Sequence, residues 1–262
     1  MKIDFHTHCF PDRVAKKAID ILSYNSGGLE PQTDGTIDGL KAVMKQDGVN
    51  ISVIANIATN KEQMVAVNNF AASVKSDDII PFGSVHPQAE NVLEELERIK
   101  EMGLKGVKFH PDYQNFFVDE DFMKPIYRKI GELGLVTLFH SGLDIGFAAP
   151  YHGMPQNFKK ALFWFDSSVV LAHWGGAFVA EQVIDLLAGE NVYFDTSFGY
   201  GTVPKPYLQQ ILDKHGPDRI LFGSDMPWQR PSWIDKTLNT LSISESDLEK
   251  IYYKNAKILL RL

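Results

Sequence analysis

The chain has 262 residues, of which 44% are hydrophobic and 23% are charged, and its formal net charge is −7. This composition predicts a soluble globular protein with one large core, and the length suits an α/β barrel of about 250 residues. The sequence contains no dense run of Lys and Arg, which argues against nucleic acid and anionic membranes as partners. A small anionic substrate is not excluded, because a local pocket can oppose the global charge.

The N-terminal sequence has neither the apolar segment nor the cleavage site of a secretory signal. No apolar run approaches the roughly 18 residues that a membrane span requires. Cys9 is the single cysteine, so no disulfide can form within the chain. Together these features predict a cytoplasmic protein.

Short β-branched or aromatic runs alternate along the chain with longer amphipathic segments. The expected strands are residues 2–8, 51–58, 79–87, 106–111, 135–142, 169–176, 191–197 and 219–228. Among the expected helices, 91–103 and 121–134 each end on a glycine suited to a left-handed cap. Residues 244–262 predict a final amphipathic helix, which Ser244 would cap.

Strand–helix alternation predicts parallel strands with right-handed crossovers. About eight such units favour a closed (β/α)8 TIM barrel over an open doubly wound sheet. An open sheet would be expected to carry a glycine-rich phosphate loop after its first strand, and here that strand ends in His-Thr-His. We therefore predict a single barrel domain over residues 1–262.

The alternation of side chains along each strand predicts which residues face the barrel interior. In the first strand the polar set would face inward and the apolar set would face the helices. The inward set is Asp4, His6 and His8, and the outward set is Ile3, Phe5 and Thr7. By the same rule Lys108 would share a face with His110, and His140 with Leu138 and Val136. His173 would share a face with Leu171 and Val169.

Four histidines and one aspartate fall at the C-terminal ends of expected strands, which converge on one mouth of a barrel. They are His6, His8, His140, His173 and Asp225. Imidazole and carboxylate form a donor set that suits Zn²⁺, Mn²⁺, Fe²⁺ or Co²⁺. Taken singly, each residue has an ordinary alternative, since a lone histidine is often hydrogen-bonded in a core and an aspartate after a strand often caps a helix. The joint pattern predicts a metal site.

Five segments resemble the strand-end motifs of the amidohydrolase superfamily, in particular its amidohydrolase-2 (amidohydrolase-related) branch. They are DFHTH, LFHSG, LAHWGG, VYFDTS and LFGSDMPW. The resemblance extends over essentially the whole chain. It implies a metallo-dependent hydrolase barrel and does not name a substrate.

The resemblance implies that His6, His8, His140 and Asp225 hold a divalent metal, most often zinc. His173 would bind a second metal or polarise substrate or water. Lys108 stands where two-metal relatives carry a carbamylated lysine that bridges the ions. The alternative for Lys108 is an inward amine paired with a carboxylate or with substrate. The sequence therefore leaves open whether the site holds one metal ion or two.

The implied activity is hydrolysis of an amide, ester or lactone carbonyl of a small molecule. A bound cation lowers the pKa of water, and Asp225 would accept its proton and pass it to the leaving group. His173 would help to stabilise the oxyanion.

Three further residues are candidates for substrate binding, each with an ordinary alternative. His110 could contact substrate or make a core hydrogen bond. His152, in the long loop 141–158, could reach the site or lie in solvent. Arg230 could hold a substrate carboxylate or form a surface salt bridge. Asp195 is expected to support the metal site from behind, and His215 is expected to be solvated.

Two other functions compete with hydrolysis. Relatives of this branch include non-oxidative decarboxylases of aromatic or unsaturated acids, and hydration of an unsaturated acid is a third reaction type. The other rival is an inactive barrel with a binding role, which the full set of ligand types disfavours. A homodimer is a common default for enzymes and is not tested by the sequence.

Overall fold

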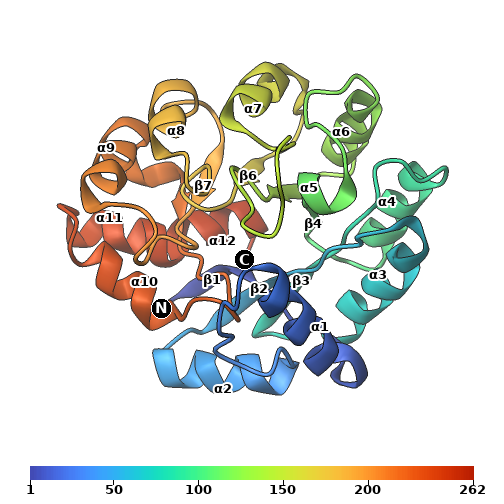
Figure 1. Ribbon diagram of the computed structural model, residues 1–262, viewed down its shortest axis with the longest axis horizontal. Helices are drawn as coiled ribbons and strands as arrows, with labels where there is room; N and C mark the ends of the chain where they lie inside the picture. Colours follow the sequence, from blue (N-terminus) through green and yellow to red (C-terminus); the bar gives the residue numbers. More distant parts are fainter.

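Eight parallel strands form the centre of the molecule, and helices surround them (Figure 1). The computed structural model describes all residues, 1–262. The strands are β1 (Ile3–Thr7), β2 (Ile51–Ala55), β3 (Ile79–Phe82), β4 (Gly106–Phe109), β5 (Val136–Phe139), β6 (Val169–Leu171), β7 (Tyr193–Asp195) and β8 (Ile220–Leu221).

The connections between the strands carry the helices. They are α1 (Asp12–Asn25), α2 (Ile37–Asp47), α3 (Met64–Ser73), α4 (Val92–Glu101), α5 (Pro111–Gln114), α6 (Met123–Glu132), α7 (Pro155–Ala161), α8 (Ala180–Leu186), α9 (Lys205–His215), α10 (Pro231–Leu238), α11 (Glu245–Glu249) and α12 (Asn255–Leu260). Short 3₁₀ segments lie at Lys61–Gln63, Leu162–Trp164 and Pro217–Arg219. None of the helices combines the length and apolarity that crossing a membrane requires.

The strands pair in sequence order as β1-β2-β3 and as β4-β5-β6-β7-β8. Backbone hydrogen bonds connect these two sheets on both sides. Gly83, directly after β3, donates from its N–H to the Gly106 carbonyl at 2.9 Å, and Phe5 of β1 donates to the Phe222 carbonyl at 2.8 Å. The fold is therefore the predicted TIM barrel.

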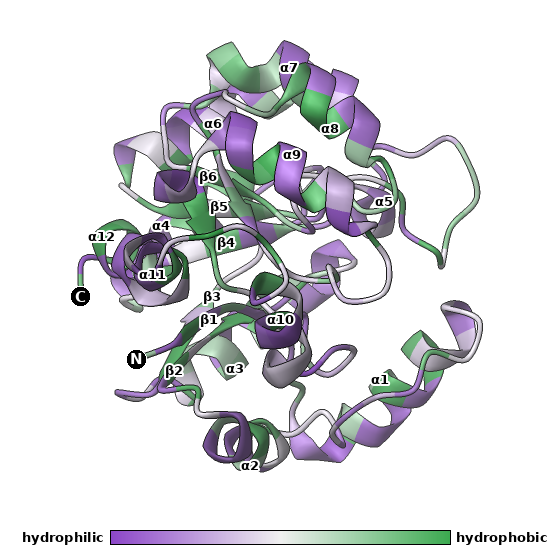
Figure 2. Cartoon of the chain, turned by 90° about the vertical axis from the view of Figure 1, so that its left-hand side faces the viewer, coloured by the Kyte–Doolittle hydropathy of each residue, from purple (hydrophilic) through white to green (hydrophobic).

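The barrel is filled by buried apolar side chains of β1, β2, β3, β5, β6 and β8, and the partly buried Tyr193 of β7 packs against them. This interior cluster has 14 buried members, among them Phe5, Phe82 and Leu138, and includes residues of α12, which lies on the opposite side of the strands from α1 (Figure 2). β4 contributes Gly106 instead of an apolar side chain. A Cβ at Gly106 would lie 2.6 Å from the Phe82 ring, so the packing of that ring requires glycine here.

The expected faces hold for β5 and fail for β1. Val136 and Leu138 belong to the interior cluster, as predicted. On β1, however, Ile3 and Phe5 also pack in the interior, although they were expected to face the helices. The register between β1 and β2 shifts between Asp4 and Thr7, where β1 has one residue more than its partner. A bulge of this kind turns two successive side chains to one side, so Phe5 and His6 can both face inward.

The expected face is also wrong on β6. Val169 and Leu171 pack in the outer cluster between strands and helices, and Val170 packs in the interior. His173 nevertheless reaches the mouth of the barrel, because the chain after β6 leaves the strand conformation and His173 has a φ of 61°. Strict alternation therefore gave the right site residue for a wrong geometric reason.

The predicted C-terminal helix is broken into two parts. Ser244 caps α11 by accepting a hydrogen bond from Asp247 N–H, as expected. A π-helical turn at Lys250–Lys254 then separates α11 from α12. The π-helical turn contacts the chain just after β8, since the Phe222 N–H donates to the Ile251 carbonyl at 2.9 Å.

Candidate metal centre and active site

A cavity of about 650 Å³ opens at the C-terminal ends of the strands. Seven of the nine residues predicted for the site line it. They are His6, His8, Lys108, His110, His140, His173 and Asp225. The fold thus brings together side chains that lie more than 200 positions apart in the sequence, and it delivers them to the mouth that the barrel topology predicts.

Three ligand atoms meet at the floor of this cavity. Asp225 Oδ1 lies 3.0 Å from His8 Nε2 and 3.4 Å from His6 Nε2. One ligand atom from each of His6, His8 and Asp225 lies within 4.8 Å of the other two. This group can hold a metal ion.

The outer hydrogen bonds of the two histidines fix which nitrogen carries the proton. His8 Nδ1 lies 2.8 Å from the Ala55 carbonyl oxygen, which can only accept, so Nδ1 is the donor. His6 Nδ1 lies 2.9 Å from Asp195 Oδ2 and is likewise the donor. In the neutral rings both Nε2 atoms therefore carry lone pairs, and these point at the carboxylate of Asp225. Three acceptors facing one another repel unless a cation lies beside them. Lys108 Nζ lies 3.1 Å from His6 Nε2, and a metal ion would serve all three acceptors.

The protonation of His6 agrees with this picture. Burial first, and then the positive charge of Lys108, lower the pKa of His6 well below its ordinary value. His6 is therefore neutral, which is the form that binds metals. Burial raises the pKa of the Asp225 carboxyl, and the nearby positive charge of Lys108 opposes this rise.

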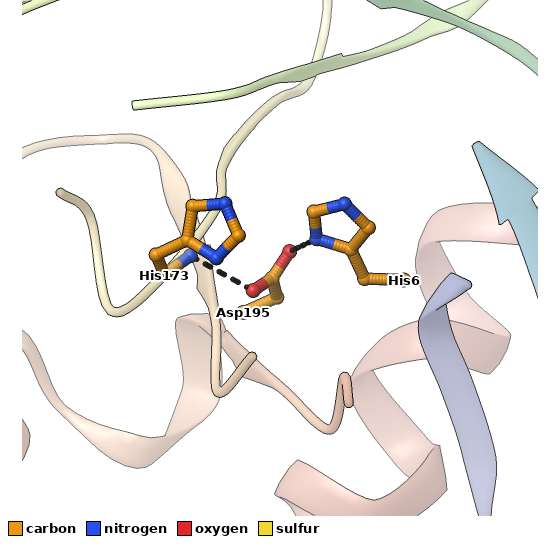
Figure 3. A group of neighbouring side chains, drawn as sticks. All are labelled: His6, His173 and Asp195. Carbon is orange, nitrogen blue, oxygen red and sulfur yellow. Dashed lines mark hydrogen bonds and ion pairs between the residues drawn. The ribbon is translucent and has the colours of Figure 1, made fainter. Parts of the chain in front are cut away.

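Asp195 holds two of the histidines from behind (Figure 3). It is fully buried at the end of β7, and its Oδ1 accepts the backbone N–H of His173 at 3.0 Å while its Oδ2 accepts from His6. A glycine in the neighbouring strand makes room for this arrangement, since a Cβ at Gly223 would lie 3.2 Å from the Cβ atoms of both His6 and Asp195. Asp195 thus contacts both His6 and His173, which is the position expected of a residue that supports metal ligands, and the three side chains also form a group that could hold a metal ion.

A chain of hydrogen bonds runs from Asp195 to His140. The Ser197 hydroxyl donates to Asp195 Oδ1 and accepts from His173 Nδ1 at 2.8 Å. His173 Nε2 is then the acceptor, and it receives the Nδ1–H of His140 at 3.1 Å. His140 Nε2 is left with a lone pair, and this buried atom has no hydrogen-bond partner. A buried imidazole nitrogen that has a lone pair and no hydrogen-bond partner suits a metal ligand, so the side chains of the cavity fit a divalent cation.

Lys108 lies beside these ligands, with its Nζ 3.1 Å from His6 Nε2. The side chain is almost completely buried, and burial lowers its pKa to about 8, although Asp195 and Asp225 oppose the shift. Lys108 therefore holds an inward position at the site, which agrees with both of the roles considered for it.

His110 forms a second group with His140 and Asp144 farther up the cavity. Its ring stacks on the His140 ring with centroids 4.1 Å apart. His110 Nδ1 accepts the Tyr113 backbone N–H, which leaves Nε2 to donate to Asp144 Oδ2 at 3.0 Å. Asp144 belongs to the long loop after β5, so this bond connects the loop to the floor of the site.

The remaining two predicted residues do not line the cavity. His152 Nδ1 lies 2.8 Å from Asp112 Oδ1, and its ring packs on Phe117. Arg230 donates to both carboxylate oxygens of Asp47, at 3.1 and 2.7 Å. For Arg230 the structure thus has the salt bridge that was considered as the alternative to substrate binding.

Two of the site residues have strained backbones. Asp225 has a φ of 68° and His173 a φ of 61°, a region that residues other than glycine rarely adopt. Such strain persists where the surrounding structure enforces it and is concentrated at functional sites.

Sequence reasoning missed Ser197 and Asp144. Ser197 stands two positions after Asp195 in the motif VYFDTS, a spacing that could have identified it. No local signal identifies Asp144, because its contact with His110 depends on the path of the loop.

Comparisons with known proteins agree with this geometry. The family model described as Amidohydrolase (Amidohydro_2) matches residues 3–262. No curated protein matches the sequence significantly. Among solved structures, an uncharacterised TIM-barrel protein of Bordetella bronchiseptica superimposes with a TM-score of 0.80 at 21% identity, over 99% of this chain and 98% of that one.

Two decarboxylases are also similar in structure. The 5-carboxyvanillate decarboxylase of Sphingomonas paucimobilis has a TM-score of 0.75 and 17% identity, over 100% of this chain and 99% of that one. A dihydroxybenzoic acid decarboxylase of Polaromonas, solved with manganese and 2-nitroresorcinol, has a TM-score of 0.72 and 18% identity, over 100% and 97%. At these identities the likeness shows the fold alone.

The family match covers nearly the whole chain, so this protein belongs to the Amidohydrolase family. This is a family of TIM-barrel enzymes, as the sequence motifs predicted.

Proposed function

We propose that the protein is a metal-dependent hydrolase that cleaves an amide, ester or lactone carbonyl of a small molecule. The observation that carries the proposal is the convergence of three lone pairs, from His6 Nε2, His8 Nε2 and Asp225 Oδ1, at the floor of the cavity. His140 Nε2 supplies a fourth ligand atom, which has no hydrogen-bond partner. We assign the metal to these four residues, with zinc as the first choice and manganese, iron and cobalt as alternatives.

A divalent cation at this position would lower the pKa of water and polarise a carbonyl oxygen. The residues of the chain would do the remaining work. Asp225 would accept the proton of the attacking water and pass it to the leaving group, and the burial of its carboxylate favours proton uptake. His173, whose Nδ1 proton is held by Ser197, would fix the orientation of the His140 ring, because its Nε2 accepts the His140 Nδ1–H.

Non-oxidative decarboxylation is the second candidate. Decarboxylases that act on 5-carboxyvanillate and dihydroxybenzoic acid share this fold, and one of them was solved with manganese. Lys108 also favours this reading, because an inward cation beside His6 could hold a substrate carboxylate. In that reaction Asp225 would donate a proton to carbon after carbon dioxide leaves.

The test is to offer metal-loaded protein two panels, one of esters, amides and lactones and one of aromatic and unsaturated acids. Release of acid without carbon dioxide supports hydrolysis, and release of carbon dioxide supports the second candidate. Asp225→Asn with its metal content measured is the control for adventitious catalysis. Full turnover by that variant would contradict the role given to Asp225 in both reactions.

The number of ions depends on Lys108. A carbamate on this lysine would turn a cation into an anionic ligand and bridge two metals. Elemental analysis of wild type and Lys108→Ala separates the cases. One metal ion per chain in both proteins would indicate a mononuclear site. Two ions per chain in the wild type and fewer in Lys108→Ala would indicate a carbamate-bridged pair.

A further inference from the structure

The upper wall of the cavity differs from its floor. α1 lines this wall with Val14, Ala18, Ile21 and Leu22, which recur at the spacing of one helix face. From Val14 to Leu22 this stripe is about 12 Å long, at 1.5 Å per residue. On its other face α1 buries only Ala15 and Ile19.

α3 adds a second apolar surface to the same cavity. Ala66, Val67 and Phe70 line it together with the α1 stripe. Although they line a cavity, Val14 and Ile21 remain 40% and 48% exposed. Figure 2 shows α1 away from the strands, at the edge of the molecule. Exposed apolar surface of this kind marks a binding groove.

The groove and the metal group belong to one cavity, which decides what the groove can hold. A substrate whose carbonyl sits at the floor can extend along the α1 stripe and the α3 surface, or toward the loop residues Leu143, Ile145 and Phe178, which also line the cavity. The α1 stripe supplies four apolar side chains from one helix face. The cavity volume of about 650 Å³ lies in the range that binds drug-sized ligands. Arg13 and Lys17 also line the cavity, but both are exposed and can keep their charges in water while their stems cover the groove.

We propose that the substrate carries a medium-length alkyl chain, such as the acyl chain of an ester or amide, which lies along the α1 stripe and the α3 surface. This proposal rests on the proposed hydrolysis for the position of the reacting carbonyl. A narrow aliphatic stripe on a helix suits a flexible chain, because each methylene gains burial without requiring a polar partner.

The first experiment measures binding and not turnover. Metal-loaded wild-type protein is titrated calorimetrically with acetate, butyrate, hexanoate, octanoate and decanoate, which are the acids that such a hydrolysis would release. We expect the affinity to rise about threefold to fourfold with each added methylene until the stripe is filled. Equal affinity for all five acids would overturn the proposal.

The second experiment blocks the groove. Ala18→Trp would fill the α1 stripe and should abolish the dependence of affinity on chain length. The matched control is Lys16→Trp, because Lys16 is exposed on the same helix and does not line the cavity. If circular dichroism shows that Ala18→Trp does not fold, Val67→Trp on α3 replaces it with the same expectation.

These measurements separate the groove from the reaction. Chain-length-dependent binding without hydrolysis of any ester or amide would keep the groove and reject the proposed function. Hydrolysis of short esters, together with equal affinity for all five acids, would support the proposed function and contradict the proposed binding of an alkyl chain in the groove. If Ala18→Trp instead preserves the chain-length dependence and converts a dimer to a monomer in sedimentation, the stripe is an interface between two copies and the proposal is wrong.

Discussion

The floor and the wall of the cavity are built in opposite ways. On the floor, outer hydrogen bonds hold the rings of His6 and His8 in place, and His140 Nε2 is buried without a partner. Two floor residues also keep strained backbones. The wall consists of exposed aliphatic side chains from α1, which make few demands on geometry. On our proposal the strand ends carry the reaction and α1 selects the substrate, so α1 could vary without disturbing the metal ligands.

The largest effect is expected from Asp225→Asn, which removes the proton acceptor of the floor and leaves the wall intact. Loss of a positioned acid–base group lowers turnover by about 10² to 10⁴-fold. The measurement is kcat on whichever panel the wild type accepts, with metal content determined for both proteins. A fall in metal content alone, with normal kcat per metal, would give Asp225 a ligand role only.

Ser197→Ala should give the next largest effect. Ser197 does not line the cavity and would act through His173, whose Nδ1–H its hydroxyl accepts. Without its hydroxyl, neither the His173 proton nor the lone pair on His140 is held in place. Loss of such a supporting residue costs about 10 to 100-fold in metal affinity or activity. Metal affinity is measured by competition with a chelator, and Ser73→Ala on an exposed helix end is the control. If Ser197→Ala changes neither the metal affinity nor the activity, the supporting role proposed for this chain of hydrogen bonds is wrong.

His215 provides a comparison with a buried histidine outside the cavity. Its ring stacks on Phe194 with centroids 3.9 Å apart, and burial lowers its pKa to about 4. The unfolded chain takes up the His215 proton near pH 6.5, whereas the folded chain takes it up only near pH 4. The folded state is therefore most stable above pH 6.5 and loses stability as the pH falls toward 4.

The free energy of unfolding of the wild type should therefore fall relative to His215→Gln by about 3 kcal/mol between pH 7 and pH 4. Urea titrations of both proteins at several pH values measure the difference. A difference that does not vary with pH would show that His215 takes up its proton in the folded state as easily as in the unfolded state.

The smallest effect is expected from Arg230→Met. This residue was a candidate for substrate binding, but its guanidinium pairs with Asp47 away from the cavity. Partly exposed ion pairs contribute up to about 1 kcal/mol, so the variant should be slightly less stable. KM should not change. A large rise in KM for an anionic substrate would contradict this prediction and show that Arg230 binds the substrate.

The sequence predicted the barrel and most of the floor because both depend on local patterns. Strand–helix alternation identified eight units, and each of the histidines at the floor follows a recognisable strand. Prediction failed where local geometry departs from regular alternation. The bulge in β1 and the left-handed His173 changed which neighbours face the interior.

Long-range contacts account for the other failures. His215 was expected in solvent, yet it is 3% exposed because α9 packs against β7. His152 and Arg230 were placed near the site by their position after a strand, but Asp112 and Asp47 bind them elsewhere. The α1 stripe was not predicted, because its role depends on where α1 lies relative to the barrel mouth.

The most direct test of the central claim is the metal content of protein purified without chelator or affinity metal. Elemental analysis would compare the wild type with a His6→Ala/His8→Ala double variant that circular dichroism shows to be folded. The account predicts one or two divalent ions per chain in the wild type and close to none in the double variant. A wild type that binds no metal even after loading, or a double variant that keeps its metal, would contradict it.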